Sequence, residues 1–374
     1  YRLFGDSAEV EPFAMLKGDG GVGKSRLAAT VAAEAERRGW DVVVGRAYPV
    51  ETGAPFALIS DAFVPLLRDL EEQTLTVLTR GTQDELRRLF PALGTPAGRE
   101  MSGVGPGEQQ AQLFWHFSDL LGALANRTPL LVVLEDLQWA DASSLSLLHF
   151  VARQLGDAPL RILATCNTEY RDGADRLLPM ERSLVSLGRL HLAPLNPLTR
   201  DHTGDLVEVV FQASGPPVRE FSDVLYGWTR GNPFFIEETL RALVDSGRLY
   251  HREGTWLGWG ARELELPNSI RDAIAARMAG LSDPARAVAD VLAVAGAPIG
   301  VAAVERVAGL SPGEIAAAVE ELQRPGLVEE SRVGRGVAVH FRHPLGREAL
   351  HQRLSLTRRR GLHLAIADAL EQIH

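Results

Sequence analysis

Short apolar runs alternate with longer segments of helical periodicity over the first half of the chain. The runs predict five buried strands at residues 13–16, 41–45, 130–134, 161–165 and 189–192. The intervening periodicity predicts helices at residues 26–38, 56–70, 109–125 and 143–155. The run 130–134 is apolar at every position, as expected of a central parallel strand. Strands alternating with helices predict an α/β fold with a doubly wound, five-stranded parallel sheet, whose ligands bind at the C-terminal ends of the strands.

Strand signals stop near residue 197, and mainly helical segments follow. Helices are predicted at 200–211, 218–228, 234–245, 268–279, 283–295, 301–308 and 312–323. The aromatic, turn-rich segment 248–259 favours a hairpin, and glycine and proline between 94 and 107 favour a loop. Strands at 326–330 and 336–341 come next, and two helices from Pro344 and about Thr357 close the chain. Helices followed by a two-strand wing predict a winged helix.

Composition narrows the class of protein. A chain of 374 residues with 45% hydrophobic and 23% charged residues is expected to form two or three globular domains. Its net charge of −9 argues against generic binding to nucleic acid or to anionic membranes. The single cysteine, Cys166, excludes an internal disulfide framework and fits a reducing cytoplasm. No apolar run approaches the length of a membrane span, and the first residue, Tyr1, leads us to expect part of a longer protein.

The strongest chemical signal is the segment GDGGVGKS at residues 18–25, which matches G-x-x-x-x-G-K-[ST]. It lies between a predicted strand and a predicted helix, where backbone N–H groups can surround a triphosphate. Lys24 can reach the β and γ phosphates, and the Ser25 hydroxyl can hold Mg²⁺. The alternative, a chance glycine-rich turn, does not explain this context. The predicted nucleotide contacts here are Gly18, Gly20, Gly21, Val22, Gly23, Lys24, Ser25 and Arg26.

A pair of acids ends the strand at 130–134. Such a pair can bind Mg²⁺ and activate the attacking water. We assign Glu135 to the metal and Asp136 to the water, although the two roles can be exchanged, and we count Lys24 with them as catalytic. The alternative is an ordinary acid pair on a solvated loop.

The segment LEDLQWAD at residues 134–141 resembles the Leu-Asp-Asp-Leu-x-Trp-Ala-Asp pattern of STAND-type signal-transduction ATPases, an AAA+-related group. The similarity is greatest to large ATP-binding bacterial regulators that usually carry a LuxR-type DNA-binding domain at their C-terminus. The order of elements along the chain places domain boundaries near 196 and 266. We therefore expect a nucleotide-binding domain at 1–196, a helical domain at 197–265, a winged helix at 266–355 and the start of a further helical segment at 356–374, and the resemblance covers nearly the whole chain.

The resemblance also assigns nucleotide contacts beyond the glycine-rich loop. The block GNPFFIEE at 231–238 implies that Pro233 packs on the adenine, although a simple helix stop and restart is an equal alternative. The block FRHPL at 341–345 implies that His343 contacts the β-phosphate of ADP, the alternative being a histidine at a helix N-terminus. Phe4, beside Gly5 near the N-terminus, is included as a further contact.

Two departures from the family pattern bear on catalysis. Gly5 is followed by Asp6 instead of arginine, and the fourth strand ends in Asn167 where the family has arginine near the γ-phosphate. A neutral amide can orient a phosphate oxygen but does not neutralise charge in the transition state. Arg171 is near enough in sequence to substitute. We therefore expect slow hydrolysis.

DNA binding by this chain is not expected. The segment 312–323, the candidate recognition helix, carries mainly glutamates at its polar positions, which disfavours contact with phosphates. We expect DNA to be contacted only through a domain outside this chain. The first hypothesis is a cytoplasmic switch that ADP closes and ATP opens for self-association, with weak Mg²⁺-dependent ATPase activity. The second is a non-hydrolysing interaction scaffold with a structural nucleotide.

Overall fold

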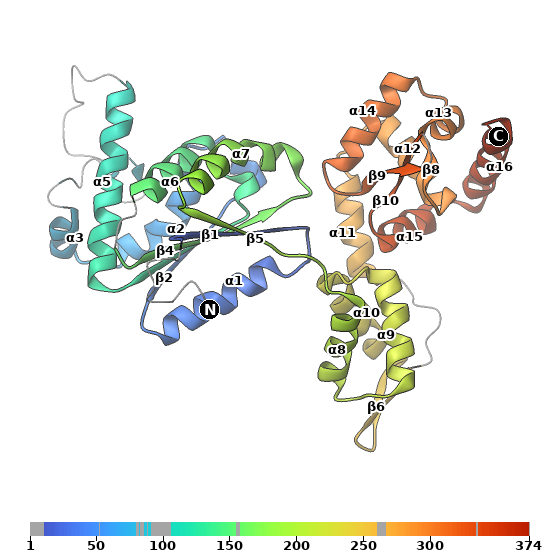
Figure 1. Cartoon of the computed structure of the whole chain (residues 1–374), viewed down its shortest axis with the longest axis horizontal. Helices are drawn as coiled ribbons and strands as arrows, with labels where there is room; N and C mark the ends of the chain where they lie inside the picture. The colour runs from blue at the N-terminus through green and yellow to red at the C-terminus, as the bar shows by residue number, and fades with distance from the viewer. Residues whose placement is uncertain are drawn as a thin grey trace. The chain divides into compact units, whose positions relative to one another are not determined.

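The computed structural model describes residues 11–51, 53–79, 82, 86–87, 89–90, 106–154, 158–259, 267–333 and 336–373. The chain divides into two compact units, Tyr1–Leu195 and Asn196–His374. Figure 1 colours the first unit from blue to green and the second from yellow-green to red. The domain boundaries expected from the sequence stay predictions.

A parallel sheet forms the centre of the first unit and confirms the predicted five strands. Its strand order is β2-β3-β4-β1-β5, so β4 separates β1 from β3. In this register Gly18 pairs with Asn167, and Arg46 pairs with Glu135. The C-terminal ends of all the strands therefore meet at one edge of the sheet. The strands are β1 (Phe13–Gly18), β2 (Asp41–Arg46), β3 (Leu130–Glu135), β4 (Leu160–Asn167) and β5 (Leu190–Pro194).

Helices cover both faces of this sheet (Figure 1). Along β1, Phe13 and Met15 belong to one core while Ala14 and Leu16 belong to the other, because successive side chains of a strand point to opposite faces. One face packs on α1 (Lys24–Arg37). The other packs on α2 (Ala57–Arg68), α5 (Pro106–Arg127), α6 (Ala142–Gln154) and α7 (Arg171–Ser186).

The structure adds elements that the sequence analysis did not predict. Helix α7 connects β4 to β5, and its buried Leu177, Met180 and Leu184 have the spacing of one helix face, which would have revealed it. Short helices η2 (Pro49–Glu51), α3 (Glu72–Thr79) and η4 (Leu137–Trp139) were also missed. The predicted loop at 94–107 lies outside the described residues except at its end, where α5 already begins at Pro106.

The second unit begins with three helices and a hairpin. Helices α8 (Arg200–Phe211), α9 (Pro216–Thr229) and α10 (Pro233–Asp245) share an apolar core. Strands β6 (Tyr250–Arg252) and β7 (Thr255–Leu257) pair antiparallel and confirm the predicted hairpin. Its turn residues Glu253 and Gly254 both have positive φ, 51° and 80°, as a tight hairpin turn requires.

The rest of the second unit packs around α12 (Asp283–Ala295), which is buried on several sides. A small sheet of order β8-β10-β9 is antiparallel. The predicted strand at 326–330 was placed two residues early, because Gly326 adopts a left-handed turn with φ 67°. The remaining elements are α11 (Asn268–Met278), β8 (Ile299–Gly300), α13 (Val301–Ala308), α14 (Pro312–Gln323), β9 (Val328–Val333), β10 (Gly336–Phe341), α15 (Pro344–Arg353) and α16 (Leu356–Ile373).

The winged helix predicted at residues 266–355 stays a prediction.

Within the described residues, every helix is too short or too polar to cross a bilayer.

Candidate functional site

The glycine-rich loop leads from the end of β1 into the start of α1. Gly21 and Gly23 have φ values of 83° and 95°, which glycine adopts without strain. A Cβ on Gly18 would come within 2.3 Å of the Leu195 carbonyl oxygen, so this position also accepts only glycine. Among the described residues, no side chain caps the N-terminus of α1, and its first turn has no acid. The helix start therefore has the backbone geometry and polarity of an anion site.

Lys24 bends back over this loop. Its Nζ donates hydrogen bonds to the carbonyl oxygens of Gly18 (2.9 Å) and Asp19 (2.7 Å). The side chain is buried, and burial lowers the pKa of Lys24, while the negative charges of Asp136 and Glu169 oppose this shift. A phosphate beside this ammonium would reduce the cost of its burial. The residues present thus fit a bound nucleotide phosphate.

The other predicted loop contacts differ in exposure. Val22 is buried, Ser25 is half-buried and Arg26 is exposed. Only the last two can therefore offer side chains to a ligand, whereas Val22 can contribute its backbone.

The two acids at the end of β3 are both engaged by Arg46, the last residue of the neighbouring strand β2. The Nη2 atom of Arg46 lies 3.1 Å from Glu135 Oε2, and its Nε lies 3.0 Å from Asp136 Oδ2. Burial disfavours the charge of Arg46, but the hydrogen bond and charge of Asp136, with Glu135, outweigh it and raise the pKa of Arg46. The sequence analysis missed Arg46. Its position at the end of a predicted strand was the available signal.

Asp136 is held in an unusual backbone conformation, with φ 61° and ψ 44°. Its N–H donates to Thr165 Oγ1 at 2.9 Å, and its Oδ1 accepts from Gln138 Nε2 at 3.1 Å. The side-chain oxygen of Gln138 accepts from the N–H of Asn167 at 2.9 Å. Buried Gln138 therefore connects Asp136 to the end of β4, where we placed Asn167 by resemblance.

A second set of hydrogen bonds joins the end of β4 to the glycine-rich loop. Glu169 is 2% exposed, and its Oε2 accepts from the N–H of Gly20 at 3.1 Å. Thr168 Oγ1 donates to Asp19 Oδ1 at 2.9 Å, and the Asn167 Oδ1 accepts from the N–H of Glu169 at 3.0 Å. A carboxyl oxygen thus lies within hydrogen-bond distance of a loop N–H. Sequence reasoning did not find Glu169.

Part of the LEDLQWAD segment has a structural role. The buried carboxylate of Asp141 accepts from Ser144 N (2.8 Å), Ser144 Oγ (2.5 Å) and Phe56 N (2.9 Å). It thereby stabilises the start of α6 and ties α2 to it. The Trp139 ring packs on Tyr170, with 4.6 Å between centroids. The contacts of Asp141 and Trp139 are therefore structural ones.

The remaining candidates lie in the second unit and are described within it. Pro233 is the first residue of α10, after Asn232, whose side-chain oxygen accepts from the N–H of Phe234 at 3.1 Å. His343 precedes α15 and is buried, and its ring centroid lies 5.2 Å from that of Phe235. Both residues lie at helix starts, as the alternative interpretations expected, and their contacts with nucleotide stay predictions.

Two other positions named from the sequence cannot be placed. Phe4 lies outside the described residues, and so does the side chain of Arg171.

Comparisons with known proteins agree with this core. Residues 1–163 match the family model described as an AAA ATPase domain. The Walker-type ATPase PABY2304 of Pyrococcus abyssi shares the fold, with 16% identity, a TM-score of 0.55 and coverage of 92% of each chain. The family match and the parallel sheet support a P-loop, nucleotide-dependent ATPase.

Two other solved structures are similar at lower scores. A STAND protein of Pyrococcus horikoshii with a tetratricopeptide repeat sensor has 14% identity and a TM-score of 0.37, covering 97% of this chain and 43% of its own. RuvB of Thermotoga maritima has 12% identity and a TM-score of 0.39, with coverage of 88% and 85%. No curated protein sequence matches the chain.

Proposed function

We propose that this chain is the ATP/ADP-operated switch of a bacterial transcriptional regulator of the LuxR-associated STAND type. ADP holds a closed, inactive state, and ATP favours an open state that self-associates. Hydrolysis is slow and resets the switch. The observation that carries the proposal is the pairing of Arg46 with both Glu135 and Asp136 beside a fully formed glycine-rich loop. The site is built to bind a nucleotide, while a cation occupies the acids that hydrolysis requires.

The chain's own residues divide the work at the site. Lys24 and the N–H groups at the start of α1 hold the phosphates, and Arg26 is exposed beside them. Ser25 and Glu135 are the residues for Mg²⁺, which supplies charge neutralisation when it is bound. Asp136 orients and deprotonates water once it is released from Arg46. Asn167 contributes only a neutral amide, which also favours slow turnover.

The second unit supplies the regulatory part of this proposal. Pro233 is the candidate adenine contact and His343 the candidate ADP sensor of a winged-helix domain. Exposed Glu314 and Glu320 on α14 disfavour contact with DNA phosphates, so DNA is bound only through a domain outside this chain.

The second candidate function is a non-hydrolysing scaffold with a structural nucleotide. The ion pairs of Arg46 with Glu135 and Asp136 favour the scaffold function if they never separate. Single-turnover phosphate release from Mg²⁺-ATP separates the two functions. The switch predicts slow release by the wild type that exceeds an Asp136→Ala control, together with stabilisation against heat by ADP that Lys24→Ala abolishes. ADP stabilisation with no phosphate release above that of Asp136→Ala would establish the scaffold. The absence of both ADP stabilisation and phosphate release would refute nucleotide binding.

A further inference from the structure

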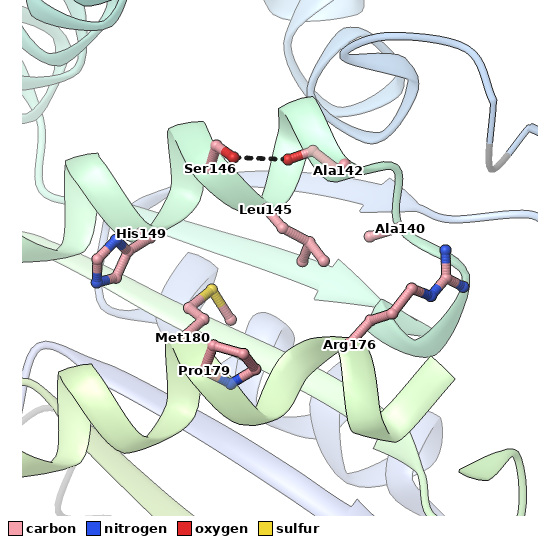
Figure 2. A pocket seen from close by; sticks show the side chains of 8 residues that line it. All are labelled: Ala140, Ala142, Leu145, Ser146, His149, Arg176, Pro179 and Met180. Carbon is pink, nitrogen blue, oxygen red and sulfur yellow. Dashed lines mark hydrogen bonds between the residues drawn. The ribbon is translucent and has the colours of Figure 1, made fainter. Parts of the chain in front are cut away.

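A pocket with a volume of about 380 Å³ lies between α6 and α7 (Figure 2). Its volume is at the lower end of the range typical of small-molecule sites. Leu145 points into it from α6, and Pro179 and Met180 line it from α7. Arg176 and His149 lie at opposite ends. The pocket is therefore elongated, with an apolar middle and polar ends.

Among the described residues that line this pocket, Arg176 provides the one full positive charge. Its Nη2 donates to the Gln138 carbonyl oxygen at 3.2 Å, and no carboxylate of the described residues forms an ion pair with it. A guanidinium has five N–H donors, so most of them are available to a ligand. The planar arrangement of these donors matches the two oxygens of a carboxylate.

The opposite end of the pocket is polar but not charged. His149 Nε2 lies 2.9 Å from Ser183 Oγ, so the imidazole already has a hydrogen-bond partner. Burial lowers the pKa of His149, and the charge of Arg153 lowers it further, so the ring is neutral at pH 7. A matching ligand carries one negative charge at one end and an apolar body, with at most a polar group at its far end.

We propose that this pocket binds a small amphipathic carboxylate, with its carboxylate on Arg176 and its apolar body against Leu145 and Met180. The apolar residues exclude water from the body of the ligand, and Arg176 orients it.

This pocket is also connected to the candidate catalytic acids. The carbonyl of Gln138 is held by Arg176, while the side chain of the same residue supports Asp136 Oδ1 and the N–H of Asn167. A ligand that draws the guanidinium away from this carbonyl changes the support of Asp136. The bound carboxylate therefore alters the rate of ATP hydrolysis, a consequence that rests on the proposed function.

The binding test uses 3-phenylpropanoate as the probe and its uncharged amide as the matched ligand, titrated by calorimetry without nucleotide. We expect saturable binding of the acid, weakened roughly tenfold or more by Arg176→Gln and unchanged by Arg182→Gln, which alters an exposed arginine of the same helix. A second variant, Ala142→Trp, fills the pocket from an exposed position and should also abolish binding. Equal binding of the amide, or binding unaffected by Arg176→Gln, would overturn the site.

The coupling test measures phosphate release from Mg²⁺-ATP with and without the probe. A change in rate that disappears in Arg176→Gln supports the coupling. Binding with an unchanged rate overturns the coupling alone. Because the calorimetric experiment contains no nucleotide, failure of the proposed ATPase function is distinguishable from failure of the pocket.

Discussion

Replacing Arg46 with alanine is expected to accelerate ATP hydrolysis. The substitution removes the cation that pairs with Glu135 at 3.1 Å and with Asp136 at 3.0 Å. The backbone of this position should stay in place, because its N–H is bonded to Asp61 Oδ2 at 2.8 Å and its strand pairs with β3. Both acids then become available to Mg²⁺ and water without prior separation from the guanidinium.

The size of the effect follows from the exposure of the three side chains. Arg46 is 46% exposed, and Glu135 and Asp136 are 16% and 26% exposed, so water screens both ion pairs substantially. Half-exposed pairs of this kind are worth about 0.5–1 kcal/mol each, and two together about 1–2 kcal/mol. Releasing the acids should therefore raise the hydrolysis rate about 5- to 30-fold. Since the pKa of Arg46 is raised, its guanidinium keeps its charge at every pH used in such assays.

The assay is steady-state phosphate release at saturating Mg²⁺-ATP. Arg200→Ala is the matched control, because Arg200 forms an exposed pair with Asp223 at 3.0 Å in the other unit and should leave the rate unchanged. A rate for Arg46→Ala equal to or below that of the wild type would show that Arg46 does not restrain the acids. A rise in Asp136→Ala/Arg46→Ala similar to that in Arg46→Ala would assign the water-activating role to another group.

Two further predictions concern stability. Asp141→Ala removes the acceptor of three hydrogen bonds and leaves Phe56 N and the start of α6 without their partner, so the free energy of unfolding in urea should fall by about 2–4 kcal/mol. Burial raises the pKa of Cys166 from 9.0 to about 11, so the stability that the neutral thiol contributes is complete below pH 9 and is lost as the pH rises to about 11. The loss approaches about 3 kcal/mol and is measured by urea unfolding at several pH values.

Further variants serve as controls for the predictions on Asp141 and Cys166. Asp141→Asn keeps one oxygen acceptor and should lose less stability than Asp141→Ala; equal stability of the wild type and Asp141→Ala would contradict the capping role. Cys166→Ala should show a smaller decline in stability between pH 9 and 11 than the wild type. An identical decline in the two proteins would mean that groups other than the thiol cause it.

Local patterns were sufficient for most of the fold. The central strand β3 is a short, fully apolar run, because a strand buried on both faces excludes polar side chains, whereas the edge strands β2 and β5 are partly exposed and less uniform. The glycine-rich loop was recognisable because a left-handed backbone at Gly23 and a close approach at Gly18 restrict these positions to glycine. Helix α7 was missed although Leu177, Met180 and Leu184 carry the required period. That omission was avoidable.

Local patterns did not predict which residues meet at the candidate site. Periodicity shows that a strand is buried but does not identify its neighbours, since strand pairing joins residues far apart in the chain. The order β2-β3-β4-β1-β5 brings Arg46 beside the acids of β3, and it places Asn167 between those acids and the glycine-rich loop. Gln138 and Glu169 then complete the hydrogen bonds across this edge.

The glycine-rich loop and the acid pair are thus readable from consecutive residues, because each is a property of one strand end. The restraint of the acids by Arg46, and the pocket that Arg176 and His149 delimit, arise from segments that meet only after folding. The candidate nucleotide site is therefore encoded locally, whereas the proposed control of hydrolysis depends on long-range packing.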